Sequence, residues 1–428
     1  MTERFRITLA QLNPTVGDIA GNAAKARAAW QQGREAGADM VALPEMFITG
    51  YQTQDLIEKP VVHQAAIAAI EALAKDCAEG PTLAIRGPAL EGAGLYNAYY
   101  ILTKGRIVSR VLKHDLPNET VFDEVRLYDS GPLGGPYSVG NTRIGSPICE
   151  DAWHPEVPET LAETGAEFLL VPNGSPYYRG KLDTRLNQMV ARVVETGLPL
   201  IYLNMVGGQD DQVFDGATFG LNPGGELAFI LPPFDEALAH IDLTRGPEGW
   251  RIEPGEKAHQ PDQWEQDYRA MVQSLRDYCG KTGFRKVLLG LSGGIDSAIV
   301  ATYIAERALA SPGPAVTRAT PGRPVNRPHA SAMCTAAASC RTWTRSTPVS
   351  MHASKTAMIW FPESVNSRPT PAATNERARR SAPRICYSFG YRDTKRVEGA
   401  SAPLNDEVRD SLAHHHHRHV DVSPDTIG

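Results

Sequence analysis

The sequence predicts an α/β protein, because strand-like and helix-like segments alternate over most of its 428 residues. Four of the predicted strands lead directly into reactive or polar groups, which are Glu45, Lys113, Cys149 and residues 173–176. In α/β proteins the chemistry usually lies at strand ends. The length allows two or three domains, and 42% hydrophobic with 21% charged residues is typical of a soluble globular protein.

The first 250 residues contain most of the predicted regular structure. Apolar runs predict strands at residues 6–12, 39–44, 82–86, 95–102, 106–112, 142–144, 166–171, 198–204, 226–230 and 240–243. The pair at 95–102 and 106–112 is expected to form a hairpin. Helical patterns occupy residues 22–36, 65–75 and 181–196. The polar segment 207–216 predicts a loop and the entry to a hairpin. Its apolar flanks suggest that it borders the pocket where the reactive strand ends meet.

A second unit follows a predicted linker. Residues 246–261 are rich in Gly, Pro and charge, and we set the boundaries at 1–250, 251–261 and 262–310. Asp262 is a good N-cap for the next segment, whose apolar residues recur at helical spacing.

The second unit continues with a buried strand at 286–289, a Gly- and Ser-rich loop at 290–297 and a helix that reaches residue 307. This order predicts an anion site, since backbone N–H groups and the helix N-terminus face the ligand. The loop is not a Walker A motif, because the Gly-Lys-Ser/Thr ending is absent.

Cys149 lies in the run Ser-Pro-Ile-Cys-Glu-Asp-Ala-Trp, on a tight turn beside two carboxylates. A lone cysteine is more often a small buried hydrophobe than a nucleophile. A reactive cysteine needs a base or a positive charge nearby, because the thiolate is the nucleophile. Glu45 and Lys113 would supply a base and an oxyanion stabiliser, so the convergence of the three at strand ends favours a catalytic site.

Together these motifs resemble the glutamine-dependent NAD⁺ synthetase family. Residues 1–250 resemble its nitrilase-type glutaminase domain, an αββα sandwich, through Leu-Pro-Glu at 43–45, the runs around Lys113 and Cys149, and Val-Gly-Gly-Gln-Asp at 206–210. Residues 262–310 resemble the start of the synthetase domain. That domain is a Rossmann-like parallel α/β fold of the adenine-nucleotide-hydrolase type, whose pyrophosphate loop reads Ser-Gly-Gly-Ile-Asp-Ser.

The resemblance implies a role for each motif. Cys149 would attack the side-chain amide of glutamine, Glu45 would act as general base and acid, and Lys113 would stabilise the oxyanion. Ammonia would travel to the second site, where ATP with Mg²⁺ adenylates deamido-NAD⁺ and ammonia displaces AMP, without a tightly bound prosthetic group. Glutamine would be bound by Glu119, Ser175 and Lys181. ATP would be bound by Gly290, Leu291, Ser292, Gly293, Gly294, Ile295, Asp296 and Ser297, with Asp296 also a Mg²⁺ ligand.

Two stretches depart from the family's pattern. Glu119 and Thr120 stand where the family usually has Tyr-Gly, so a carboxylate replaces an aromatic hydroxyl. Residues 311–428 lack the family's Thr-Gly-Asn-Lys-Ser-Glu segment and are crowded with Pro, Arg, Ser, Thr and Ala, which predicts a disordered or low-complexity tail. The abrupt change also suggests a shift of reading frame near codon 310. Such a chain is expected to hydrolyse glutamine weakly and not to make NAD⁺.

Two alternative functions stay open. One is a stand-alone glutaminase or other carbon–nitrogen hydrolase with a vestigial nucleotide-binding segment. The other is a degenerate nucleotide-binding protein that regulates a partner, and the intact Glu45, Lys113 and Cys149 argue against it.

Composition excludes several classes of partner. A formal net charge of −6 gives no electrostatic argument for nucleic acid. Six cysteines without close pairs at metal spacing predict neither a zinc site nor a disulfide framework. The N-terminus has no signal-peptide core and no apolar run could cross a bilayer, so we expect a cytoplasmic protein without membrane partners. The resemblance implies small-molecule substrates and a homo-oligomer.

Overall fold

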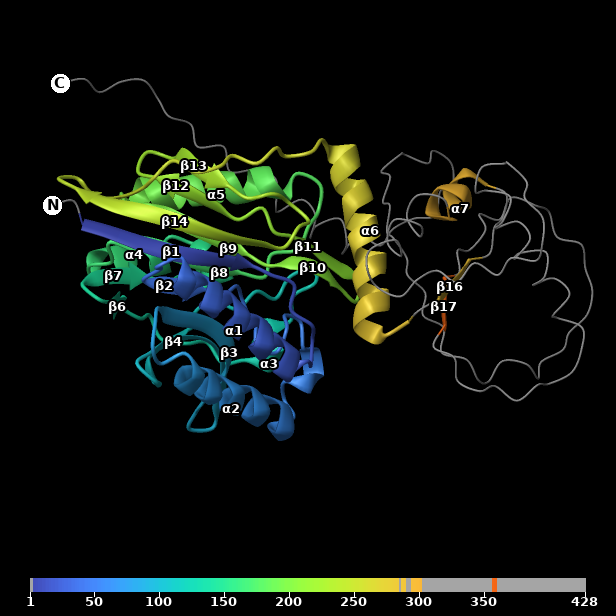
Figure 1. Cartoon of the computed structure of the whole chain (residues 1–428), viewed down its shortest axis with the longest axis horizontal. Helices are drawn as coiled ribbons and strands as arrows, with labels where there is room; N and C mark the ends of the chain where they lie inside the picture. Colours follow the sequence, from blue (N-terminus) through green and yellow to red (C-terminus); the bar gives the residue numbers. More distant parts are fainter. Residues whose placement is uncertain (1–2, 285, 290–293, 302–355, 360–428) are drawn as a thin grey trace, which may run out of the picture. The chain divides into compact units, whose positions relative to one another are not determined.

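The computed structural model describes residues 3–284, 286–289, 294–301 and 356–359 (Figure 1). Two large β-sheets dominate these residues, with strand orders β15-β14-β1-β2-β3-β4-β5 and β13-β12-β9-β8-β7-β6. The first sheet comprises β1 Glu3–Gln11, β2 Met40–Ala42, β3 Thr82–Glu91, β4 Gly94–Thr103, β5 Arg106–Leu112, β14 Ala237–Gly246 and β15 Gly249–Ile252. The second comprises β6 Tyr137–Val139, β7 Thr142–Gly145, β8 Phe168–Asn173, β9 Leu200–Asn204, β12 Phe219–Asn222 and β13 Glu226–Ile230.

The two sheets pack against each other through a shared apolar core. Phe5 and Ile7 of β1 are buried in the same cluster as Phe168 and Leu170 of β8. Each pair is two residues apart, so both side chains point to one face of their strand. The rings of Phe5 and Phe168 have centroids 5.6 Å apart. The inner faces of the sheets therefore form one hydrophobic layer.

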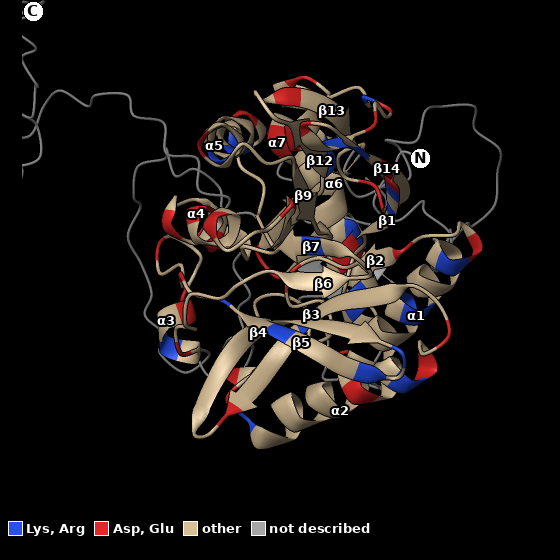
Figure 2. Cartoon of the chain, turned by 90° about the vertical axis from the view of Figure 1, so that its left-hand side faces the viewer, with Lys and Arg blue, Asp and Glu red and all other residues tan. Residues whose placement is uncertain are grey.

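Helices cover the outer face of each sheet, so the layers are αββα, and the predicted fold is confirmed. Trp30 and Ile70 pack with Val41 of the first sheet, whereas Met189 packs with Leu169 of the second. Figure 2 shows charged positions on all four of these helices, as expected for amphipathic helices with one face in water. The helices are α1 Ile19–Glu35 and α2 Pro60–Asp76 on the first sheet, and α4 Glu156–Glu163 and α5 Lys181–Thr196 on the second.

Strand direction brings several strand ends to one edge of each sheet. β1, β2 and β3 are parallel in the first sheet, and β7, β8 and β9 are parallel in the second. β5 also runs in the direction of β3, because β4 is antiparallel to both. The segments that follow β2, β5, β7 and β8 are therefore placed where the predicted reactive residues can meet.

Every strand and helix predicted in residues 6–245 is present, with altered ends, including the hairpin of β4 and β5. Besides a 3₁₀ turn at Gln54–Leu56, the missed elements are β6, α3 Glu124–Leu127, α4 and β12. Three of them are at most four residues long, which is too short to show a period. α4 contains Pro158, which masked its helical pattern.

The predicted linker at 246–261 is partly wrong, because it contains β15. This strand pairs antiparallel with β14, and its Trp250 is buried beside Phe5 in the core between the sheets. The N–H of Ala258 also donates to the carbonyl of Ile230 at 2.9 Å. Two buried side chains on a short strand are enough to attach this Gly-rich segment to the sheet.

A hairpin and a long helix follow the prediction closely. β10 Val206–Gln209 and β11 Gln212–Asp215 are antiparallel partners within the segment predicted as a hairpin entry. α6 Gln263–Thr282 begins at the predicted cap, where the Asp262 carboxylate accepts the N–H groups of Trp264 and Glu265 at 2.9 and 3.0 Å. It ends at Gly283, whose φ of 75° favours glycine.

Few residues are described after α6. β16 Lys286–Leu289 pairs in parallel with β17 Thr356–Ile359, and α7 spans Ile295–Ile299. β17 lies within 311–428, where composition predicts no regular structure, so that prediction is wrong for these four residues. The rest of 311–428, and the predicted end of the last helix at 307, lie outside the described residues. No helix within the described ranges is long and apolar enough to cross a membrane.

The core between the sheets predicts the effect of a large-to-small change. Phe168→Ala should lower the free energy of unfolding by about 3–5 kcal/mol, because it removes a fully buried ring. Val61→Ala, at a side chain that is 73% exposed, should change it by less than about 0.5 kcal/mol. Urea unfolding followed by circular dichroism measures both. Equal effects would contradict the assignment of Phe168 to the core.

Candidate active site

The structure brings Glu45, Lys113 and Cys149 together in the interior. Glu45 follows β2, Lys113 follows β5, and Cys149 begins the 3₁₀ turn Cys149–Ala152 after β7. All three side chains are buried. Lys113 Nζ donates to Glu45 Oε1 at 2.9 Å, and the charges of both Glu45 and Lys113 act on the pKa of the Cys149 thiol. The three residues converge because the strands that precede them share one edge of the sandwich.

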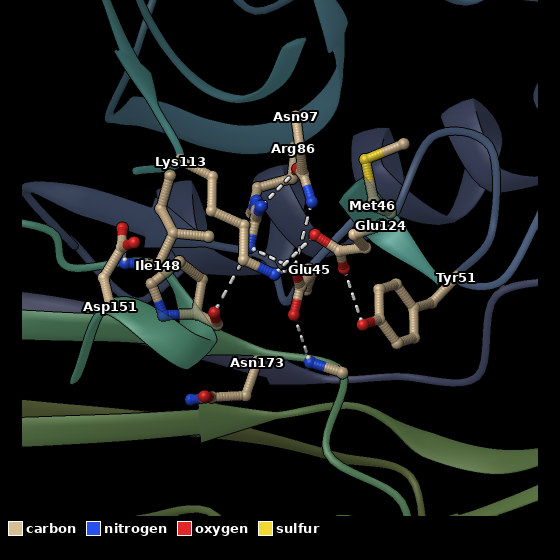
Figure 3. Close-up of polar contacts among 12 residues, drawn as sticks. Glu45, Met46, Tyr51, Arg86, Asn97, Lys113, Glu124, Ile148, Asp151 and Asn173 are labelled. Carbon is tan, nitrogen blue, oxygen red and sulfur yellow. Dashed lines mark hydrogen bonds and ion pairs between the residues drawn. The ribbon is translucent and has the colours of Figure 1, made fainter. Parts of the chain in front are cut away.

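Glu45 is the centre of the polar network (Figure 3). Besides Lys113, its Oε1 accepts from Asn97 Nδ2 at 3.1 Å and lies 3.1 Å from Arg86 Nη1. Its Oε2 accepts the N–H of Gly174 at 2.9 Å. Burial alone would raise the pKa of Glu45, but the charges of Arg86 and Lys113 outweigh it and lower the pKa. The carboxylate is therefore ionised.

Lys113 lies between two carboxylates. Its Nζ also donates to Glu124 Oε2 at 2.8 Å, and the hydroxyl of Tyr51 donates to Glu124 Oε1 at 2.8 Å. Burial opposes the charged form of Lys113, but Glu124 and Glu45 raise its pKa, so the ammonium stays charged. Among the described residues these carboxylates occupy two of its three N–H donors, which leaves a third for charge that develops on a substrate.

Asp151 fixes the turn that carries the cysteine. Cys149 has a φ of 51°, a left-handed conformation that is rare outside glycine. Asp151 Oδ2 accepts the N–H of Ile148 at 2.9 Å, and its Oδ1 accepts those of His114 and Asp115 at 3.1 and 2.7 Å. Burial raises the pKa of Asp151 to about 6, against the effect of these hydrogen bonds. One carboxylate thus joins the turn to the segment after β5.

The protonation states of Cys149 and Glu45 are complementary. Burial raises the pKa of Cys149 well above its usual range, and the negative charge of Glu45 raises it further, although Lys113 opposes both. The resting pair is a neutral thiol beside an ionised carboxylate. Because a thiol must lose its proton to become a nucleophile, Glu45 is placed to accept that proton.

Ser175 belongs to a second buried cluster, just after β8. Its N–H donates to Asn204 Oδ1 at 2.9 Å, and its Oγ accepts from Arg185 Nε at 3.0 Å. Arg185 in turn makes a two-point ion pair with Asp215, at 2.9 and 2.8 Å. These contacts fix both the backbone and the hydroxyl of Ser175.

Lys181 and Glu119 lie in different surroundings. Lys181 begins α5, and its Nζ lies 4.2 Å from the centroid of the Trp153 ring, which ends the turn of the cysteine. Burial lowers the pKa of Lys181, and Tyr178 opposes this effect. Glu119 is exposed, beside Thr120 with its φ of 58°. Lys181 is thus near the nucleophile, whereas Glu119 faces solvent.

The predicted nucleotide loop is described only in part. Gly290, Leu291, Ser292 and Gly293 lie outside the described residues. Gly294 precedes α7, Ile295 and Asp296 are exposed in its first turn, and Ser297 Oγ donates to the carbonyl of Gly294 at 3.0 Å. Within the described ranges no group of three or more His, Cys, Asp or Glu could hold a metal ion.

Sequence reasoning missed the residues that surround Glu45 and Lys113. Glu124 lies in α3, far from any strand end. Arg86 and Asn97 lie within β3 and β4, and Arg86 also hydrogen-bonds to Asn97. A charged residue inside the apolar run of β3 was the available signal for Arg86. Asp151 was noted only as a neighbour of the cysteine.

The electrostatics predict an unusual response to Glu45→Gln. Thiolate fraction, and with it alkylation of Cys149 by iodoacetamide, rises as pH passes the thiol pKa. The charge of Glu45 raises this pKa and that of Lys113 lowers it. In Glu45→Gln, of these two charges only that of Lys113 is left, so the midpoint of the alkylation rate against pH should move to lower pH. Alkylation of Cys149 at pH 8 should become several times faster.

Mass spectrometry of the Cys149 peptide measures this rate. Asp123→Asn, at an exposed carboxylate paired with Arg126, is the matched control and should leave the midpoint unchanged. A midpoint that moves to higher pH in Glu45→Gln would refute the electrostatic assignment.

Comparison with protein families matches residues 6–247 to Carbon-nitrogen hydrolase and residues 267–354 to NAD synthase. A glutamine-dependent NAD(+) synthetase of Rhodobacter capsulatus is 60% identical over 306 residues, which are 72% of this chain and 55% of that protein. One from Xylella fastidiosa (strain 9a5c) is 38% identical over 315 residues, 70% of this chain and 55% of the relative.

Solved structures agree with these matches. The glutamine-dependent NAD+ synthetase from Acinetobacter baumannii, in complex with adenosine diphosphate, gives a TM-score of 0.68 at 31% identity, covering 72% of this chain and 58% of that one. The chain spans about half the length of the curated relatives it matches. The match at 6–247 includes the whole network around Glu45 and more than half of the sequence, and the chain belongs to the carbon-nitrogen hydrolase family.

Proposed function

We propose that this chain comes from a glutamine-dependent NAD⁺ synthetase, in which the side-chain amide of glutamine is hydrolysed at Cys149 and the ammonia serves the ATP-dependent amidation of deamido-NAD⁺ to NAD⁺. If the reading frame is shifted near codon 310, the chain itself should retain only the first step. The products would be glutamate, NAD⁺, AMP and pyrophosphate. The convergence of the buried Cys149 thiol with an ionised Glu45 that accepts a hydrogen bond from Lys113 is the observation that carries the first step. The NAD synthase match and the names of the relatives support the second.

The geometry supports a sequence of proton transfers through Glu45. Glu45 takes the thiol proton as the sulfur of Cys149 bonds to the amide carbon, and the amide oxygen becomes an oxyanion that faces Lys113. Glu45 then gives the proton to the amide nitrogen, so ammonia leaves and a thioester remains. Water, deprotonated by Glu45, attacks the thioester carbon. Glutamate leaves as the sulfur regains a proton.

Three residues are proposed to bind the substrate. The ammonium of Lys181, whose Nζ lies 4.2 Å from the Trp153 ring beside the nucleophile, suits the α-carboxylate of glutamine. Ser175 is fixed by Arg185 and Asn204 and offers polar atoms at the end of β8. Glu119 would attract the α-ammonium group from the exposed loop, since it is the carboxylate that replaces the family's tyrosine.

The second step is assigned to the second unit. Residues 290–297 would bind ATP, and Asp296 would be a ligand of Mg²⁺, which would neutralise charge on the pyrophosphate. The proposal needs no tightly bound prosthetic group. It also includes a cytoplasmic location, a homo-oligomeric assembly and the absence of nucleic-acid and membrane partners.

Replacing the nucleophile tests the first step. Cys149→Ala should reduce glutamate production by about 10³-fold or more, because it removes the sulfur on which the thioester forms. Cys77→Ala is the matched control, since Cys77 is another buried free cysteine, on the outer side of the first sheet. A glutaminase assay coupled to glutamate oxidation measures both. Glutamate production retained in Cys149→Ala would remove Cys149 from its role.

The hydrolysis of glutamine and the amidation of deamido-NAD⁺ can be distinguished by varying the nitrogen source and measuring both glutamate and AMP. AMP release that depends on deamido-NAD⁺, with glutamine or with ammonium chloride, would assign amidation to this chain. In that case Cys149→Ala should lose only the glutamine-driven reaction, and Asp296→Asn only the AMP release. Glutamate without AMP would instead favour the alternative, a stand-alone glutaminase with a vestigial nucleotide-binding segment. Chromatography of the nucleotides gives the answer.

A further inference from the structure

The segment that carries Ser175 and Lys181 is held from two sides. It connects β8 to α5 as residues 174–180. On one side it docks on β11, where the N–H of Tyr177 donates to the carbonyl of Val213 at 2.7 Å and Pro176 forms a β-bridge with Phe214. These backbone contacts hold residues 176 and 177 against β11.

α6 holds the other side mainly through the carboxylate of Asp267. Asp267 Oδ1 accepts from the hydroxyl of Tyr177 at 2.8 Å, and its Oδ2 accepts from Arg179 Nε and Nη2 at 2.8 and 2.5 Å. The Arg179 guanidinium also lies over the ring of Trp264, 4.9 Å from its centroid. The Asp267 side chain is 20% exposed, so these charge-assisted contacts are partly shielded from water.

α6 is itself attached firmly to the hairpin of β10 and β11. Asp277 Oδ2 accepts from the N–H of Gly208 at 2.5 Å and from Asn13 Nδ2 at 2.9 Å. A Cβ added to Gly208 would lie 2.9 Å from the Cα of Ser274, so the backbones of β10 and α6 are in contact. Lys281 Nζ donates to the carbonyl of Gly208 at 2.8 Å. The helix is therefore a fixed support for Asp267.

We propose that Asp267 is a positioning residue for the amide substrate, which acts through Tyr177 and Arg179 on the backbone between Ser175 and Lys181. The inference rests on the proposed function, because the ligand concerned is glutamine. Asp267 lies in the part of the chain that matches NAD synthase. A helix from the second unit thus completes the substrate site of the first, and loss of its carboxylate should weaken binding without altering the chemistry at Cys149.

The test compares Asp267→Ala with Glu265→Ala in the full chain. Glu265 is the matched control, because it is on the same turn of α6 and pairs only with Arg269 of that helix among the described contacts. Asp267→Ala should raise KM for glutamine by about tenfold with kcat changed less than about twofold, since one charged hydrogen-bond acceptor is lost. Asp267→Asn keeps an acceptor for Tyr177, so its KM should lie between that of the wild type and that of Asp267→Ala. Glu265→Ala should match the wild type.

A second readout does not need turnover. Amide hydrogen exchange in residues 174–181 should be faster in Asp267→Ala and unchanged in Glu265→Ala. Unchanged KM and unchanged exchange in Asp267→Ala would overturn the proposal. It would also be overturned if Asp267→Ala and Glu265→Ala lowered kcat and raised KM to the same extent. A wild-type chain that makes no glutamate would contradict the proposed function, whereas the exchange experiment would still decide the role of Asp267.

Discussion

The buried charge of Glu45 is the constraint on which the rest of the site depends. An ionised carboxylate without partners in an apolar interior would cost several kcal/mol, and loss of one partner from a buried pair typically costs about 3–5 kcal/mol. Lys113, Arg86 and Asn97 reach Glu45 from the first sheet, and the N–H of Gly174 reaches it from the second. The partners of this carboxylate come from both sheets, so its full set of contacts forms only when the two sheets are packed together.

Two clusters divide the work of the site. Around Glu45, Lys113 and Cys149 the contacts set protonation states, because the pKa of each group depends on the charge of the others. Around Ser175 the contacts set position, since Arg185, which is itself paired with Asp215, donates to the hydroxyl of Ser175. The two clusters have separate side-chain contacts, although they meet in sequence at Gly174, which contacts Glu45, and Ser175, which contacts Arg185.

Local signals were enough to predict the strand ends that carry Glu45, Lys113 and Cys149, because apolar runs with turn residues after them are readable over a few positions. They were not enough for Glu124 or Arg86. Each of these acquires its importance from a partner that is distant in sequence, and a helix of four residues such as α3 has no period to detect. Trp250 shows the same limit, because a Gly-rich segment became a strand only through contacts with the core.

The left-handed backbone conformation of Cys149 has a cost in folding free energy. A non-glycine residue in this region costs about 1–2 kcal/mol relative to ordinary conformations, a cost that the contacts of Asp151 help to offset. A glycine at 149 would relieve that strain, which would compensate in part for the lost packing of the thiol. The stability of the fold alone would therefore favour cysteine over glycine at this position only weakly.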